Sequence, residues 1–218
     1  MNPAEFTTAW DHPPTRRAWM LHMLKNVAGL VGWAGVWIAL LGISLETPDW
    51  AVWIFLPYWI YSPYRMLIQV GYIPTALSMR RILRTFPWQV LHDVPRGLAE
   101  YPGVVGRQYG WFELPNPADP QQRLPLVFTK HYRLNWWSRR LAPRAKPQLK
   151  AQIETVWIAG DPRMIGVIAA PTPSGQSPRR FQILDQGLGK GDGNRIAEWG
   201  ITPDDLERGR RAGVTLNR

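Results

Sequence analysis

The sequence of 218 residues contains no cysteine. A protein without thiols forms no disulfide bridges, binds neither zinc nor iron–sulfur clusters through sulfur, and has no cysteine nucleophile, so these classes are excluded. Acidic residues are scarce too, because 16 Asp and Glu stand against 26 Lys and Arg and leave a formal charge of +10. A surplus of positive charge favours an anionic partner, such as lipid headgroups, phosphates or an acidic protein.

Patterns that signal catalysis are missing as well. The histidines at positions 12, 22, 92 and 131 lack the spacing of metal ligands, and no nucleophile elbow of the form GxSxG occurs. We therefore predict that the protein is not an enzyme and uses no cofactor and no metal. The catalytic alternative is a membrane enzyme that acts on a lipid-linked substrate through His92 or His131.

What the sequence does contain is a long uncharged run. The twenty residues from Asn26 to Leu45 lie between Lys25 and Glu46 and carry no charge. At about 1.5 Å per residue, a helix of this length is roughly 30 Å long, which matches the hydrocarbon core of a bilayer. A cleaved signal peptide has a shorter apolar region that ends in a small-x-small cleavage site, so we predict a transmembrane helix instead.

A second uncharged run extends from Trp50 to Tyr64, and apolar residues continue beyond Arg65. The run is short for a full span, so a re-entrant or interfacial segment is the alternative to a tilted second helix. Basic residues flank the two runs on their outer sides, and acidic residues lie in the turn between them. By the positive-inside rule, this pattern predicts a two-pass hairpin in the cell inner membrane with both termini in the cytoplasm.

Prolines predict irregularities in the second segment. Pro57 removes a backbone donor and predicts a kink. The stretch from Met66 to Arg84 also allows an amphipathic helix on the inner leaflet, which Pro74 would interrupt.

Small residues recur along one stripe of the first predicted span. They are spaced by four, three, four and three positions, which places them on one helical face: Ala28, Gly32, Gly35, Ala39 and Gly42. Such a stripe lets another helix backbone approach closely. It predicts a packing surface for another membrane protein subunit or for a second copy of the chain, and the alternative is that the chain's own second helix packs there.

Short apolar stretches punctuated by Pro and Gly follow the membrane segment, and the clearest hairpin lies around Gly160–Arg163. We predict a small β-rich cytoplasmic domain, either an antiparallel sheet or a partly open barrel. After a Gly-rich linker, Thr202 as N-cap and Gly213 as stop predict a short C-terminal helix. The predicted organisation is an N-terminal segment, a transmembrane hairpin with its juxtamembrane segment, the β-rich domain and the tail, at residues 1–25, 26–84, 85–186 and 187–218.

The segment 121–150 is strongly basic and holds no acidic residue. Cations interleaved with aromatic rings suit a surface that binds anionic lipid headgroups or nucleic acid, and a solvated basic loop is the alternative without function. The predicted patch consists of Arg123, Lys130, Arg133, Trp136, Trp137, Arg139, Arg140, Arg144, Lys146 and Lys150. Because the domain is tethered to a membrane, lipid is favoured over nucleic acid.

The two predicted spans, followed by RRILRTFPWQVL and later by VWIAGDPRMIGVIAAP, resemble uncharacterised two-span membrane proteins of high-GC actinobacteria. This resemblance implies no activity. The residues themselves lead us to expect a non-enzymatic, membrane-anchored adaptor or accessory subunit of a larger inner-membrane assembly. The alternative is a membrane-tethered module that binds nucleic acid through the basic patch, for DNA transfer or anchoring.

Overall fold

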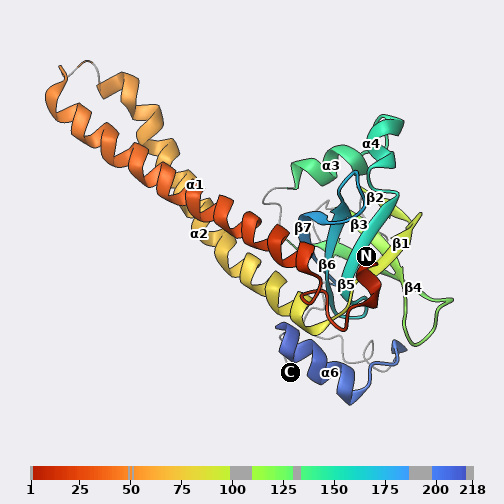
Figure 1. The fold of residues 1–218 in the computed structure, drawn as a ribbon. Coiled ribbons are helices and arrows are strands. Elements are labelled where there is room, and N and C mark those ends of the chain that lie inside the picture. Colours follow the sequence, from red (N-terminus) through yellow and green to blue (C-terminus); the bar gives the residue numbers. More distant parts are fainter. Residues whose placement is uncertain are drawn as a thin grey trace. The chain divides into compact units, whose positions relative to one another are not determined.

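The computed structural model describes residues 2–48, 50, 52–98, 110–129, 134–186 and 198–214. The chain divides into two compact units. One unit, Trp19–Leu77, is a pair of long helices, and the other, Met1–Ala18 with Ser78–Arg218, contains a β-sheet and short helices (Figure 1). We call them the helix pair and the sheet unit.

The helix pair is built from most of α1 (Pro13–Glu46) and α2 (Val52–Thr85). Side chains of one helix hydrogen-bond to main-chain carbonyls of the other, and three such bonds are Trp19 Nε1 to Ala76 O (3.0 Å), Asn26 Nδ2 to Gln69 O (2.9 Å) and Ser62 Oγ to Trp33 O (3.1 Å). In these pairs the residue number increases along α1 while it decreases along α2. The two helices therefore pack antiparallel, as a hairpin.

Within the described residues, α1 is the one helix that is long and apolar enough to cross a membrane. Its predicted uncharged run, Asn26 to Leu45, is the C-terminal part of a helix that begins at Pro13. α2 is equally long but carries Arg65 and three prolines, so its composition is less apolar. The crossing of α2 stays a prediction.

The break expected at Pro74 does not occur. α2 runs as one helix from Val52 to Thr85 with Pro57, Pro63 and Pro74 inside it. A proline removes one backbone donor, but the turns on either side can continue the helix when packing supports them. The stretch from Met66 onward is therefore the second half of α2 and not a separate helix.

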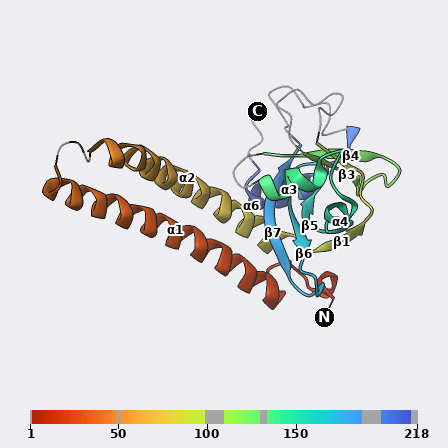
Figure 2. The same cartoon turned by 90° about the horizontal axis from the view of Figure 1, so that it is seen from above.

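The described part of the sheet unit has seven strands, all paired antiparallel. They are β1 (Gln89–His92), β2 (Arg96–Gly97), β3 (Trp111–Pro115), β4 (Arg123–Phe128), β5 (Thr155–Asp161), β6 (Ile165–Pro171) and β7 (Pro178–Asp185). Their spatial order is β1-β5-β6-β7-β4-β3-β2, and the sheet curls into an open half-barrel (Figure 2). The predicted antiparallel sheet is confirmed.

The predicted hairpin is formed by β5 and β6, with Trp157 opposite Ala169 and Asp161 opposite Ile165. Gly160 has a φ of 152°, and a Cβ there would lie 2.4 Å from Ile165 O, so only glycine fits. Both strands are buried on both faces, which explains why they read as nearly continuous apolar runs.

Each face of the sheet has its own apolar layer. On one face, Trp137 of α3 (Asn135–Leu141) packs against Phe112 and Phe128, with ring centroids 5.8 Å away in both cases. On the other, Trp88 lies 5.8 Å from Trp157. The first layer also takes in Ile153, which follows α4 (Pro147–Ala151).

Short elements near both ends of the described chain belong to the sheet unit. The segment around η1 (Pro3–Glu5) is tied to the end of α2 by backbone hydrogen bonds from Ala9 N to Phe86 O and from Trp10 N to Leu83 O, both 2.8 Å. α6 (Pro203–Ala212) is the predicted C-terminal helix. It begins with a capping box at Thr202 and ends at Gly213, whose φ is 96°, so both predicted ends are confirmed. The predicted Gly-rich linker lies outside the described residues.

Candidate functional site

The structure distributes the predicted basic patch over several elements. Arg123 lies at the start of β4, two tryptophans and two arginines lie on α3, and the remaining three cations lie between α3 and the end of α4. The side chains of Arg123, Arg139, Arg144, Lys146 and Lys150 are exposed. Lys130 and Arg133 lie outside the described residues.

The two adjacent tryptophans of α3 have different surroundings. Trp137 is a core residue that is 1% exposed, and its Nε1 donates to Arg180 O at 2.9 Å. Trp136 is half-buried at the surface, and it is the only one of the pair that offers a ring face to a ligand. A helix turns by about 100° per residue, so neighbours on α3 cannot both face the sheet.

Three guanidinium groups surround the ring of Trp136. The Cζ atoms of Arg140, Arg179 and Arg180 lie 3.7, 5.6 and 5.8 Å from its centroid. Arg140 comes from α3, whereas Arg179 and Arg180 come from the start of β7. We call these four residues the arginine cluster.

Arg140 is held firmly in the arginine cluster. Its Nε and Nη2 donate to Gln152 Oε1 at 3.1 and 2.7 Å, and its Nη1 donates to Trp136 O at 2.8 Å. Burial, followed by the positive charges of Arg179, Arg180 and Arg139, lowers the pKa of Arg140 below its ordinary value. The guanidinium stays charged, but the site carries uncompensated repulsion.

Arg140 also lines a cavity of about 450 Å³ beside β2. Two further cations line it, Arg96 and Lys150, together with the carboxylate of Asp93. Arg96 and Lys150 hydrogen-bond to the main-chain carbonyls of Val94 and Pro143. The described residues therefore give this cavity a net positive charge next to the arginine cluster.

A second cavity, of about 520 Å³, lies over β1 and β5. His92 lines it, with its Nδ1 3.0 Å from Thr155 Oγ1. Among the described residues, those that line this cavity include no carboxylate. The arrangement does not test the catalytic alternative at His92, which stays a prediction, and His131 lies outside the described residues.

The remaining histidines are structural in their contacts. His12 is fully buried, with Nδ1 2.9 Å from Thr15 Oγ1, which in turn accepts from Trp88 Nε1 at 2.9 Å. Burial lowers the pKa of His12, which favours its neutral form. His22 lies in the helix pair, with Nε2 2.7 Å from Tyr72 Oη. In the part of the chain that the structure describes, no three His, Asp or Glu residues group as a metal site.

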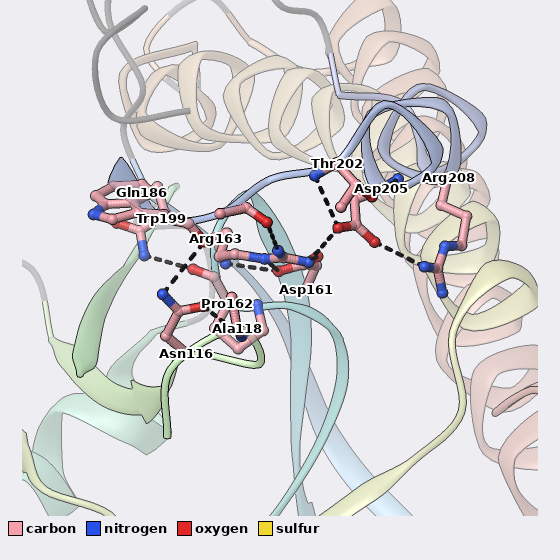
Figure 3. A network of polar contacts seen from close by, with 11 residues as sticks. Asn116, Ala118, Asp161, Pro162, Arg163, Gln186, Trp199, Thr202, Asp205 and Arg208 are labelled. Atoms are coloured by element: carbon pink, nitrogen blue, oxygen red, sulfur yellow. Dashed lines mark hydrogen bonds and ion pairs between the residues drawn. The ribbon is translucent and has the colours of Figure 1, made fainter. Parts of the chain in front are cut away.

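A buried ionic network joins α6 to the β5–β6 turn (Figure 3). Arg163 donates through Nε and Nη2 to the two oxygens of Asp161, at 2.9 and 2.7 Å, and through Nη1 to Gly200 O at 2.8 Å. Its Nη2 also lies 2.8 Å from Asp205 Oδ2, and Asp205 Oδ1 accepts from Arg208 at 2.7 Å. The sequence predicts Asp161 and Arg163 only as residues of the turn.

Each charged group of this network has an oppositely charged partner within hydrogen-bond distance. The network therefore stabilises the fold and is not a reactive site. Burial would raise the pKa of Asp205, but hydrogen bonds with Thr202 and the charge of Arg163 outweigh burial, and the pKa falls below its usual value. Burial likewise would lower the pKa of Arg163, but its bonds to Asp161 and the charges of both carboxylates raise it. Each group keeps its charge because a partner holds it.

The predicted small-residue stripe is exposed along its whole length, at Ala28, Gly32, Gly35, Ala39 and Gly42. A Cβ added at Gly32, Gly35 or Gly42 would meet nothing within 4 Å. α2 packs instead on the face that carries Gly29, where an added Cβ would lie 2.8 Å from Gln69 Nε2. The alternative in which the chain's own second helix covers the stripe is therefore wrong.

The comparisons with known proteins add no family. The chain matches no protein-family model, no curated protein and no solved structure.

Proposed function

We propose that the protein is a non-enzymatic, membrane-anchored adaptor or accessory subunit, whose helix pair crosses the inner membrane twice and carries the sheet unit in the cytoplasm. One observation carries the anchor. Every large apolar side chain that is exposed in the described residues lies between Met20 and Leu77, which is within the helix pair. In water such a surface would drive aggregation, whereas in a bilayer it contacts lipid tails.

The polar groups of the helix pair support the same proposal. Asn26, Ser62 and Gln69 are buried, and Asn26 and Ser62 hydrogen-bond across to the other helix. Arg65 places its Cζ 5.6 Å from the Trp33 ring and 5.9 Å from the Tyr61 ring. Polar side chains that turn inward while apolar ones face outward are typical of membrane-spanning helices.

The absence of cysteine makes a direct topology test possible. Single cysteines placed at Thr47 in the turn, and at Gln176 in an exposed loop of the sheet unit, give two reporters. In intact spheroplasts, a membrane-impermeant maleimide should label T47C, and it should label Q176C only after permeabilisation. Labelling of Q176C as well as T47C in intact spheroplasts would contradict the second crossing and favour a re-entrant segment, because the turn and the sheet unit would then lie on the same side of the membrane. Labelling of T47C only after permeabilisation would contradict both crossings.

The adaptor role is tested by what the full-length protein binds. After extraction in mild detergent, a defined set of membrane subunits should co-purify at stoichiometric yield with a tagged chain. The exposed stripe on α1 is the surface we assign to these subunits or to a second copy. Recovery of the monomeric chain alone would contradict the adaptor role and leave the anchor intact.

The alternative is a membrane-tethered module that binds nucleic acid for DNA transfer or anchoring. The exposed cations of the 121–150 segment favour it, since no acidic residue interrupts them. If it is correct, DNA binding by the full-length protein in neutral detergent should weaken steeply with rising salt. No binding at low salt would end this alternative.

A further inference from the structure

The arginine cluster places three positive charges around one aromatic ring without neutralising them. In the described residues, none of the ion pairs involves Arg140, Arg179 or Arg180. Arg140 donates to the amide oxygen of Gln152 and to the main-chain oxygen of Trp136, and Arg179 Nε donates to Pro171 O at 3.0 Å, so these acceptors carry no charge. Three clustered guanidinium groups repel one another, and an anion among them would remove that repulsion.

The backbone holds the cluster in position before any ligand arrives. Arg180 has a φ of 59°, a left-handed conformation that is unfavourable for an arginine. Its carbonyl accepts from Trp137 Nε1 in the core, so the core fixes this turn of the chain. Strain that the core maintains at a charged surface position is consistent with a binding role.

We propose that Trp136, Arg140, Arg179 and Arg180 form a binding site for a phosphate group. Arginine forks match the oxygens of phosphate, and a phosphate can accept from several guanidinium groups at once, where a carboxylate has only two oxygens. The positive cavity that Arg140 also lines leaves room beside the site for the rest of a phosphate-bearing molecule. The source of the phosphate is either a phospholipid headgroup or a soluble phosphate.

Arg179 and Arg180 are the residues that this site adds to the basic segment. The proposal deepens the proposed function, and it rests on that function only where the phosphate belongs to a membrane lipid. A tethered domain meets anionic headgroups at high local concentration, which favours the lipid source.

The test uses the full-length protein in nanodiscs of phosphatidylcholine, with and without phosphatidylglycerol, and inorganic phosphate as the soluble probe. Hydrogen exchange of peptides from α3 and the start of β7 is the readout. The double variant R179Q/R180N removes two cations and keeps a residue that tolerates positive φ. The control, R123Q/R144Q, removes two exposed cations of the same basic segment outside the cluster.

We expect phosphatidylglycerol to slow exchange in these peptides, and we expect R179Q/R180N to weaken the apparent affinity by roughly tenfold or more, since charge-assisted hydrogen bonds are lost. The control should change it by less than about threefold, because exposed charges act weakly. Protection by inorganic phosphate in neutral nanodiscs, and none from phosphatidylglycerol, would support the site with a soluble ligand. Unchanged exchange in the β5–β6 peptides verifies that both variants fold.

Protection by neither probe, or equal losses in both double variants, would overturn the phosphate site. Protection by an oligonucleotide alone would overturn it in favour of nucleic acid. Failure of the chain to insert into nanodiscs would contradict the membrane anchor, and phosphate titration of the full-length protein in detergent would still decide the site.

Discussion

The helix pair and the sheet unit distribute apolar and polar side chains in opposite ways. In the helix pair, large apolar side chains such as Val31, Ile38 and Ile60 are exposed, and hydrogen-bonding groups turn toward the other helix. In the sheet unit, apolar side chains cover both faces of the sheet, and the described charged side chains other than Asp161, Arg163 and Asp205 are at least partly exposed. This difference supports the proposed membrane anchor, because exposed apolar side chains contact lipid tails in a bilayer, whereas a domain in water buries them.

The two units also differ in how they bury polar groups. The sheet unit buries a complete ionic network at Asp161, Arg163 and Asp205, where each charge has an opposite partner. The helix pair buries neutral groups and stacks its one inward cation, Arg65, on aromatic rings. The largest mutational effects are therefore expected in the sheet unit.

Replacing Arg163 should have the largest effect. Arg163→Ala leaves the buried carboxylates of Asp161 and Asp205 without their partner, which costs about 3–5 kcal/mol of unfolding free energy. Urea unfolding of the full-length protein in neutral detergent, followed through exchange in β5 and β6, measures it. Arg211→Ala is the control, because its ion pair with Glu207 is exposed and contributes at most about 1 kcal/mol. Equal losses of stability in both variants would contradict a stabilising role of the buried Arg163 network.

A charge on the exposed face of α1 tests the inverted polarity directly. Ile38 is 65% exposed, so Ile38→Asp should cost little if this face meets water. If the face meets lipid, insertion should lose about 2.5–3.5 kcal/mol, which membrane insertion of a reporter fusion measures. Gln176→Asp, at an exposed position of the sheet unit, should leave both insertion and stability unchanged. Normal insertion of the Ile38→Asp protein would refute the lipid-facing assignment.

The buried His12 gives the sheet unit a pH dependence. Its pKa is lower in the folded state than the ordinary 6.5, so the unfolded chain binds the proton more tightly. Stability is therefore complete above about pH 6.5 and falls as the pH drops toward the folded pKa, by at most about 1.4 kcal/mol per pH unit. Unfolding of the full-length protein between pH 5 and 7 measures this slope. His12→Gln, which does not titrate, should flatten it, and an unchanged slope would assign the effect to another group.

Each polar contact inside the helix pair should contribute less to stability than the buried network at Arg163. Asn26→Leu removes the hydrogen bond to Gln69 O and should destabilise the hairpin by about 0.6–2 kcal/mol. Unfolding in mixed micelles with increasing dodecyl sulfate measures it. Val27→Leu, one residue along on the exposed face, should have no effect. A stabilised Asn26→Leu protein would contradict the inward orientation of Asn26.

Much of the fold could be predicted because it rests on local patterns. The β5–β6 hairpin follows from two runs rich in β-branched residues on either side of a Gly-Asp-Pro turn, and α6 follows from its two caps. The continuation of α2 through Pro74 could not be predicted, because packing along the whole helix decides whether a proline ends it.

The arginine cluster could not be predicted, because it forms by contacts between segments that are distant in the sequence. Trp136 and Trp137 look equivalent in the sequence, and only the position of α3 against the sheet separates a core ring from a surface ring. Arg179 and Arg180 lie some forty residues farther along the chain, directly after a stretch that is rich in proline. Their one signal was the adjacent pair of arginines at the start of a strand.

Substitutions at two glycines of α1 distinguish the face that packs on α2 from the exposed face. They should have the smallest effect on stability of the changes considered. Gly29→Ala places a Cβ 2.8 Å from Gln69 Nε2, which can shift, so a cost near 1 kcal/mol should offset the gain in helix propensity. Gly35→Ala has open space and should keep that gain, about 0.5–1 kcal/mol. Unfolding in mixed micelles compares the two variants.

Gly35→Leu extends this comparison to the proposed subunit contact. A bulky side chain on the exposed stripe leaves the hairpin intact, because α2 does not lie there, but it prevents close approach of another helix. Loss of co-purifying subunits with unchanged hairpin stability would therefore place the partner on the stripe. Retention of the subunits would move the partner to another surface, since a leucine in a close helix contact is not tolerated.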